Sequence, residues 1–314
     1  MKKINTLLFV ALLLIAPRVI VAQEMSRSFS GVKKINLSTS SGDCILKKGS
    51  NHEVGVHLKH SFGSGYQPVI EQQGERLTIK EDFKKGSHRG SSKWTLTIPD
   101  GVDIKVNSGS GNMEAENLEI NLKMNTGSGD IDFSRVSGDI DINTGSGDIA
   151  LKGFTGDIKA NTGSGNISAY RISGELKFNC GSGNISIKDS EAIFSANVGS
   201  GSIKATSVTL KGKSSFNSGS GDVEVFLASA LQHNIALSSG SGDARLDFRG
   251  KKIEGEIVMK ANKRNGAIKA PFDFDTIEEI DQDHNQIIVK KTAVIGDSKV
   301  KIQISTGSGT ASIQ

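Results

Sequence analysis

The chain has 314 residues, of which 37 are glycine and only four are proline, and aromatic residues make up 5%. Its formal net charge is +4, but three of the cations, Lys2, Lys3 and Arg18, lie in the first 22 residues, which leaves +1 for the remainder. This balance argues against a nucleic-acid or anionic-membrane partner, and the many glycines indicate tight turns around a thin core.

Residues 1–22 are organised like a secretory signal peptide. Lys2 and Lys3 form a charged start, residues 7–16 form an apolar run, and Ile20-Val21-Ala22 offers a cleavage site. The apolar run is shorter than the ~20 residues that a membrane-spanning helix needs, and no later segment is apolar enough to span a bilayer. We therefore expect an exported protein in the periplasm, on the outer surface or in the medium, with no integral membrane segment after cleavage.

Residues 23–106 are predicted to form an irregular β region that caps the start of a repeat array. Alternating apolar residues predict strands at 54–59, 76–80, 94–98 and 102–106. The segment Ile35–Asp43 is a looser copy of Ile140–Asp148, which indicates that the repeats begin here.

Residues 107–250 carry a regular repeat. The first glycine of a Gly-Ser-Gly segment recurs with an 18-residue period, followed by steps of 20 and 21, at Gly109, Gly127, Gly145, Gly163, Gly181, Gly199, Gly219 and Gly240. A fixed period of roughly 20 residues is typical of solenoids.

Each 18-residue unit consists of two nine-residue halves. Apolar residues recur at nine-residue steps from Met113 to Ile203, and again two positions further on, with mostly polar residues between them. Apolar, polar, apolar is the pattern of a short strand with one buried face. The predicted fold is all-β: a single-stranded, right-handed-type β-solenoid, of the β-helix or β-roll kind, with 18-residue rungs of two short strands.

An asparagine stands two positions before the first glycine of the seven Gly-Ser-Gly corners from Gly109 to Gly219. Identical amides stacked at the ~4.8 Å spacing of neighbouring strands can hydrogen-bond along the stack. We therefore predict a structural ladder of Asn107, Asn125, Asn143, Asn161, Asn179, Asn197 and Asn217.

Residues 251–314 are predicted to form longer rungs and a C-terminal cap. Strands at 251–260 and 287–291 flank an acidic run between Asp273 and His284, which we interpret as a solvated loop. A last strand at 300–304 is followed by Thr306-Gly307-Ser308-Gly309, which repeats the corner signature near the end of the chain.

No residue is predicted to be catalytic or to bind a cofactor or a metal. Asp130 and Asp148 follow Gly-Ser-Gly directly, whereas calcium-binding nonapeptide rolls place a residue between the last glycine and the aspartate, so turn-forming side chains explain this column better. His52, His57 and His60 are interpreted as surface histidines. No insertion interrupts the rungs of residues 107–208 to wall a cleft, and the sequence has no nucleophile elbow, phosphate loop or metalloprotease helix.

The repeats resemble a known family. The Gly-Ser-Gly-Asp-Ile units, together with Leu77-Thr78-Ile79, Leu96-Thr97-Ile98-Pro99 and Ser305-Thr306-Gly307-Ser308-Gly309, are similar to the bacterial putative-adhesin domain family of β-strand-repeat proteins, a domain of unknown function. The resemblance runs from about Phe29 to Ile313. It implies a β-solenoid in an exported envelope protein with an adhesin-like role, and it brings no catalytic residues.

The sequence thus predicts an exported, non-enzymatic envelope protein whose near-identical rungs form an adhesin-like binding surface by multivalency. The candidate binding face consists of Lys159, Lys177 and Lys204. The expected partner is a surface glycan or an envelope protein, and we expect neither a cofactor nor a nucleic-acid partner. The alternatives are a structural protein that associates end to end through its strand edges, and a β-helical carbohydrate-active enzyme. The sequence leaves the oligomeric state and the handedness open.

Overall fold

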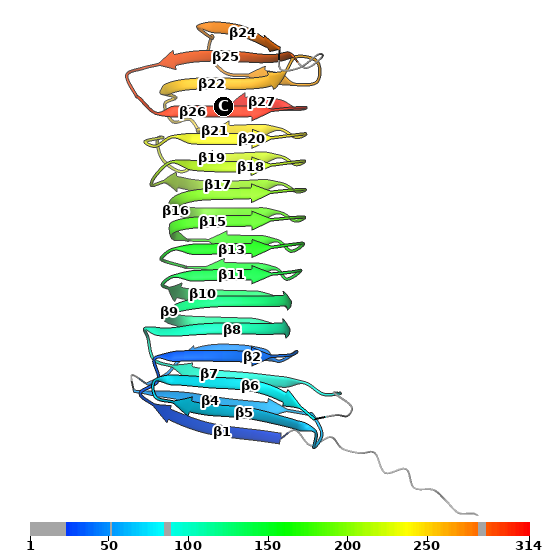
Figure 1. The fold of residues 1–314 in the computed structure, drawn as a ribbon. Coiled ribbons are helices and arrows are strands. Elements are labelled where there is room, and N and C mark those ends of the chain that lie inside the picture. The colour runs from blue at the N-terminus through cyan, green and yellow to red at the C-terminus, as the bar shows by residue number, and fades with distance from the viewer. Residues whose placement is uncertain (1–22, 51, 85–88, 282–286) are drawn as a thin grey trace, which may run out of the picture.

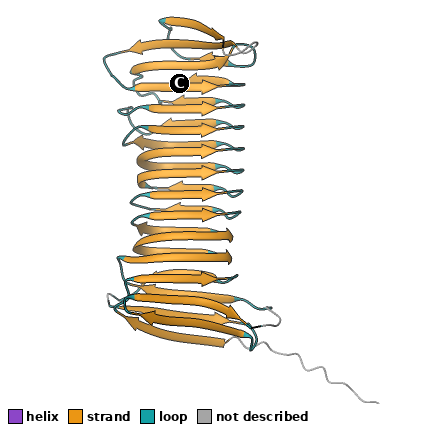
Figure 2. Ribbon diagram, in the orientation of Figure 1, coloured by secondary structure: helices purple, strands orange, loops and turns teal. Residues whose placement is uncertain are grey.

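The computed structural model describes residues 23–50, 52–84, 89–281 and 287–314, and the predicted signal peptide lies outside these ranges. Within them the chain is all-β, with 27 strands and no helix (Figure 2). The described part of the chain accordingly contains no helix with the length and apolar character that a membrane crossing requires.

The strands stack into one elongated body, with β1 and β4 to β7 at one end and β22 to β25 at the other (Figure 1). Their pairing defines two sheets, called sheet A and sheet B below. Two long strands, β9 and β16, pass through a corner and contribute to both sheets.

Sheet A contains, in order of pairing, β5 (Tyr66–Gln73), β6 (Arg76–Phe83), β2 (Lys34–Thr39), β8 (Val102–Ser110), the second part of β9 (Met113–Ser128), β11 (Ile140–Thr144), β13 (Ile158–Thr162), β15 (Ser173–Cys180), the second part of β16 (Ile185–Val198), β18 (Ser214–Ser218), β20 (Ile235–Ser239), β26 (Lys301–Thr306), β22 (Gly255–Asn262), β25 (Ile287–Ile295) and β24 (Thr276–Asp281).

Sheet B contains β1 (Gln23–Ser30), β4 (Glu53–His60), β7 (Ser92–Ile98), β3 (Asp43–Lys48), the first part of β9, β10 (Ile131–Ser137), β12 (Ile149–Lys152), β14 (Ile167–Tyr170), the first part of β16, β17 (Ile203–Leu210), β19 (Val223–Leu227), β21 (Ala244–Asp247), β27 (Thr310–Ile313) and β23 (Ala267–Lys269).

The 18-residue period appears directly in the register of the central strands. Ile140 on sheet A pairs in parallel with Leu122 and Ile158, which lie one period before and one period after it in the chain. On sheet B, Ile131 pairs in the same way with Met113 and Ile149. Nine-residue steps therefore alternate between the sheets, and the apolar residues of both point into one continuous hydrophobic core.

A buried column of small side chains, one position before the first glycine of each corner, ties the Gly-Ser-Gly corners together. Thr162 shows the arrangement: its hydroxyl accepts a hydrogen bond from the Gly165 amide and donates one to the Gly147 carbonyl of the preceding rung, both at 3.0 Å. Glycine is required in the corner because a Cβ atom at Gly147 would overlap the carbonyl oxygen of Gly129. The other buried members of the column are Thr126, Thr144, Cys180, Val198, Ser218, Ser239 and Thr306.

The two ends of the stack are closed by segments that fold back over rungs formed by distant sequence. On sheet A, β2 pairs with β8 on one side and with β6 on the other, so residues 34–48 form a full rung inside the stack. At the other end, β26 lies between β20 and β22, which places the last corner signature inside the stack as well. Residues 23–30, 49–101 and 249–300 therefore carry the strands that cover the ends.

A buried glutamate completes the first corner of the stack. In the regular rungs the first corner amide, for example that of Gly145, donates to a carbonyl of the preceding rung, here Thr126, at 3.1 Å. The corresponding Ser40 has no preceding corner and donates instead to Glu81 Oε2 at 2.8 Å. Glu81 is 6% exposed, so its carboxylate takes the place of the main-chain carbonyl that another rung would supply.

Candidate binding surface

The outward face of sheet A displays polar side chains in three parallel stripes. Because the rungs keep one register, side chains one period apart stand about 4.8 Å from each other, and stripes two positions apart along a strand are separated by about 6.7 Å. The carboxylate stripe is Asp103, Asn121, Asp139, Asp157 and Glu175; the lysine stripe is Lys105, Lys123, Asp141, Lys159 and Lys177; the asparagine stripe is the predicted ladder from Asn107 to Asn217.

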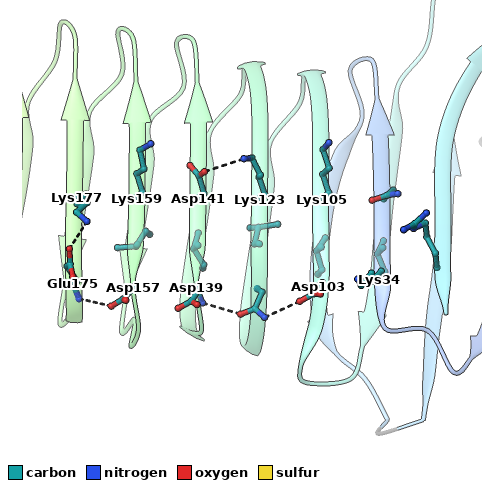
Figure 3. A pocket seen from close by; sticks show the side chains of 18 residues that line it. Lys34, Asp103, Lys105, Lys123, Asp139, Asp141, Asp157, Lys159, Glu175 and Lys177 are labelled. Atoms are coloured by element: carbon teal, nitrogen blue, oxygen red, sulfur yellow. Dashed lines mark hydrogen bonds and ion pairs between the residues drawn. The ribbon is translucent and has the colours of Figure 1, made fainter.

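An open groove of about 590 Å³ runs along the carboxylate and lysine stripes from β2 and β6 to β15. Figure 3 shows the two stripes side by side, with the carboxylates near the strand starts and the lysines one step further along. The groove therefore presents opposite charges along its two sides over several successive rungs.

Two ion pairs involve these stripes: one lies within the lysine stripe, and the other joins the lysine stripe to the carboxylate stripe. Lys123 Nζ lies 3.7 Å from an Asp141 carboxylate oxygen in the next rung, and Lys177 Nζ lies 2.6 Å from Glu175 Oε1 in its own strand. The hydrogen bond and charge of Glu175 raise the pKa of the Lys177 ammonium. Both pairs are solvent-exposed, and exposed pairs contribute little to stability, so a charged ligand can replace either partner at little cost.

The side-chain amides of the asparagine stripe form a continuous chain of hydrogen bonds. Each Nδ2 donates to the Oδ1 of the preceding rung, at 2.8 Å for Asn161 to Asn143 and for Asn179 to Asn161. The remaining steps, at 2.9–3.3 Å, join Asn107, Asn125, Asn143, Asn179, Asn197 and Asn217. The stripe is therefore a structural seam beside the groove.

The structure does not bring the three candidate lysines together. Lys159 and Lys177 are paired neighbours in the lysine stripe of sheet A. Lys204 lies on β17 of sheet B, beside Ser186 and Glu224. The reason is the nine-residue half-unit: Lys204 follows Lys177 by three halves, and an odd number of halves leads to the opposite sheet.

The groove contains residues that the sequence analysis did not single out. Lys105 and Lys123 extend the lysine stripe, and the carboxylate stripe was not recognised as a surface, since Asp139 and Asp157 were interpreted as turn residues repeated by the architecture. The signal was present, because acidic or amide residues recur at 18-residue steps from Asp103 to Glu175. Part of this stripe also supports the backbone, since Asp157 Oδ1 accepts the Glu175 amide at 3.1 Å.

The Asp/Asn column after the Gly-Ser-Gly corners is used by the backbone. Asp148 Oδ1 accepts the Asn166 amide of the next rung at 2.7 Å, and the Asp148 amide donates to Asp130 Oδ1 at 3.0 Å. Such contacts continue from Asp43 to Thr310, and a serine hydroxyl replaces the acid at Ser202. In the described residues, no group of three or more His, Cys, Asp or Glu side chains is arranged to hold a metal ion.

A family model described as Toastrack DUF4097 matches residues 32–155 and 137–314. The chain belongs to this family. The predicted resemblance to a bacterial adhesin-type domain of unknown function is thereby confirmed, as is the all-β class of the Toastrack chain.

Two solved structures align with the Toastrack chain over most of its length. A "putative cell adhesion protein" from Clostridium sporogenes is 14% identical, with a TM-score of 0.26, and covers 93% of this chain and 99% of its own. A "putative adhesin" from Bacteroides fragilis is 10% identical, with a TM-score of 0.32, and covers 93% of this chain and 97% of its own. Both likenesses are too weak to bear on function. A search among curated proteins finds no match.

Proposed function

We propose that this chain is an exported, non-enzymatic envelope protein in which sheet A serves as an adhesin-like binding surface. The observation that supports the proposal best is the groove of about 590 Å³ along two stripes of opposite charge, repeated at one register over several rungs. We also propose that the 18-residue register belongs to a single-stranded, right-handed β-solenoid. Export is supported by the signal-like residues 1–22.

The mechanism is multivalent contact with an extended polymer of the cell surface, a glycan in the first instance. Most rungs of the groove offer a carboxylate or amide, an ammonium group and an asparagine side chain of the ladder, so hydroxyl and charged groups of a repeating ligand meet similar partners every ~4.8 Å. A single exposed contact is weak, but contacts made together by one polymer add up because each later one is intramolecular.

The test uses purified residues 23–314 on arrays of bacterial and host glycans and on intact cells, with and without calcium. The double substitution Lys159→Ala/Lys177→Ala removes two adjacent charges of the groove. Lys47→Ala/Lys93→Ala, on β3 and β7 of sheet B, is the matched control. We expect loss of binding only in the first variant. Equal binding by both variants, or no binding by the unmodified protein to any glycan or cell, contradicts the proposal.

A second candidate, end-to-end association, is favoured by the outermost strand of sheet A. Among the described strands, β24 pairs only with β25, and its Ile277 side chain is 63% exposed. Such an edge can template pairing with another chain. At the opposite end, Pro68 in β5 removes an edge donor, which opposes addition there. Sedimentation over a range of concentrations tests this candidate: self-association that Ile277→Lys abolishes supports it, and a concentration-independent monomer excludes it.

A further inference from the structure

Two aromatic side chains lie on the outward face of sheet B, far from the groove of sheet A. Tyr170 ends β14 and Phe226 lies in β19, and the strand register places both in one column, with Lys188 and Thr206 between them. Both rings are half-buried. They are separated by three strand spacings, or about 14 Å.

Each ring carries stacked cations. The guanidinium carbon of Arg171 lies 4.8 Å from the Tyr170 ring centroid, and Lys188 Nζ lies 6.0 Å from it. Around Phe226, the guanidinium carbons of Arg249 and Arg245 lie 4.9 and 5.2 Å from the centroid, and Lys204 Nζ lies 5.6 Å from it. Stacking on a ring fixes the plane of a guanidinium and leaves its N–H edge free to bind an anion in bidentate fashion.

The acidic groups near the strip neutralise only part of its charge. Glu224 lies 3.2 Å from Lys204, and Asp247 accepts a hydrogen bond from Arg245 at 2.8 Å. Asp189 is exposed next to Lys188. Across the ranges that the structure describes, the guanidinium groups of Arg171 and Arg249 form no ion pair.

Both arginines have a left-handed backbone conformation. Arg171 and Arg249 have φ angles of 55° and 53°, in the left-handed region that residues with a Cβ atom adopt at a cost of about 1 kcal/mol or more. Gly153, one period before Arg171, occupies the equivalent corner with a φ of 65°. Asn117, Arg135, Asp189 and Ser207, at 18-residue steps in the same column, have φ angles of 50–57°, so the left-handed conformation belongs to the corner, and Arg171 adds a stacked cation there.

We propose that Tyr170, Arg171, Lys188, Lys204, Phe226 and Arg249, called the arginine strip, bind an acidic polysaccharide. The stacked guanidinium groups at the two rings would each hold a carboxylate, with the two lysines between them contacting intervening acidic groups. A single-stranded nucleic acid is less well matched, because such ligands stack their bases on open ring faces and cations already cover these rings. The strip faces away from the groove of sheet A and does not depend on the function proposed for it.

Alginate, a polymer of uronic acids, is a suitable probe, with neutral dextran and a single-stranded oligonucleotide as comparisons. Binding to immobilised residues 23–314 is measured at increasing NaCl concentration. We expect alginate binding that salt weakens and no dextran binding, because exposed charges are screened over a Debye length of about 10 Å at 0.1 M. Equal binding of dextran, tighter binding of the oligonucleotide, or absence of alginate binding overturns the proposal.

The decisive variant is Arg171→Gln/Arg249→Gln, which removes both unpaired guanidinium groups but keeps most of the length of the side chains. It should weaken alginate binding by about tenfold or more, since two charge-assisted contacts are lost. Arg171→Lys/Arg249→Lys keeps the charge without the planar fork and should lose affinity to an intermediate extent. Lys47→Ala/Lys93→Ala removes the same charge from β3 and β7, which lie outside both the strip and the groove, and should leave binding within about twofold. An unchanged thermal unfolding midpoint confirms that each variant is folded, and an equal loss of binding in this control overturns the assignment.

Discussion

The buried carboxylate at the N-terminal end makes a quantitative prediction about the cap. Glu81 accepts hydrogen bonds from the Ser40 amide, Tyr66 hydroxyl and Trp94 indole at 2.8, 3.0 and 3.1 Å, and also from the Ser92 hydroxyl. Glu81→Ala leaves these four donors without their acceptor. An unsatisfied buried donor costs about 1–3 kcal/mol, and because the hydroxyls can rotate toward other partners we expect a total loss of about 3–6 kcal/mol.

The chain provides a local probe for this loss, because Trp94 is its only tryptophan and lies in the cap. Urea unfolding of residues 23–314 is followed by Trp94 fluorescence for the cap and by far-UV circular dichroism for the whole stack. We expect Glu81→Ala to lower the fluorescence midpoint more than the dichroism midpoint, since stacked repeats respond mainly to their neighbours. Glu81→Gln keeps the shape of the side chain and one acceptor oxygen but introduces a donor. Its expected loss of unfolding free energy is therefore smaller than that of Glu81→Ala, about 1–3 kcal/mol.

Glu71, an exposed residue of β5, provides the control. Glu71→Ala should change the stability by less than about 0.5 kcal/mol. If Glu81→Ala also stays within about 1 kcal/mol of the unmodified protein in the fluorescence transition, the carboxylate does not substitute for the missing carbonyl, and the interpretation of the cap is wrong.

Four further changes test the corners, the ladder and the cap, each measured by chemical unfolding. Asn161→Ala interrupts the amide ladder in its middle, where Asn161 donates one hydrogen bond and accepts another, both at 2.8 Å. It should lower the free energy of unfolding by about 1–2 kcal/mol, and a loss of only a few tenths of a kcal/mol would show that the ladder contributes little. Gly147→Ala should cost more than about 3 kcal/mol because its Cβ atom overlaps a neighbouring carbonyl, whereas Gly63→Ala, with open space around it, should be near neutral. Cys180→Thr restores the corner hydroxyl and should add about 0.5–1 kcal/mol; destabilisation would refute the role given to that column. Burial lowers the pKa of His60 below its usual 6.5, so the contribution of the neutral ring to stability is present above pH 6.5 and is lost as the pH falls through the lowered pKa; His60→Gln should flatten this pH dependence of the unfolding midpoint followed by Trp94 fluorescence.

The sequence allowed the central rungs to be predicted because identical neighbours stack on one another. When residue 140 pairs with residues 122 and 158, the register follows from the period alone, and so do the positions of the buried Ile and the stacked Asn side chains. The same arithmetic, carried through at nine-residue steps, places Lys204 on the opposite sheet from Lys177. That error came from treating outward strand positions as one face.

The ends of the stack could not be predicted in this way. Strands β2 and β26 pair with partners on both sides that are distant in sequence, and their choice depends on which strand edges are open after the chain folds back. Glu81 gives no repeat signal, since its role exists only where a rung is missing. The arginine strip is also unrepeated, because Tyr170 and Phe226 lie three rungs apart with different residues between them.

Corner side chains and outward strand side chains have different roles within a rung, and this difference indicates where ligand specificity can lie. The corner side chains, such as Thr162 and Asp148, are engaged with backbone groups of adjacent rungs, and a change there is felt as lost stability. Outside the asparagine ladder, the outward strand positions have weak or no partners, as the lysine stripe shows, so a change of polar residue at them should cost little stability. A lysine that stays in register over several rungs, or an arginine that stacks on a ring without an ion pair, therefore has no explanation in folding alone. Binding experiments on these positions separate function from stability most cleanly, because there the two depend on different atoms.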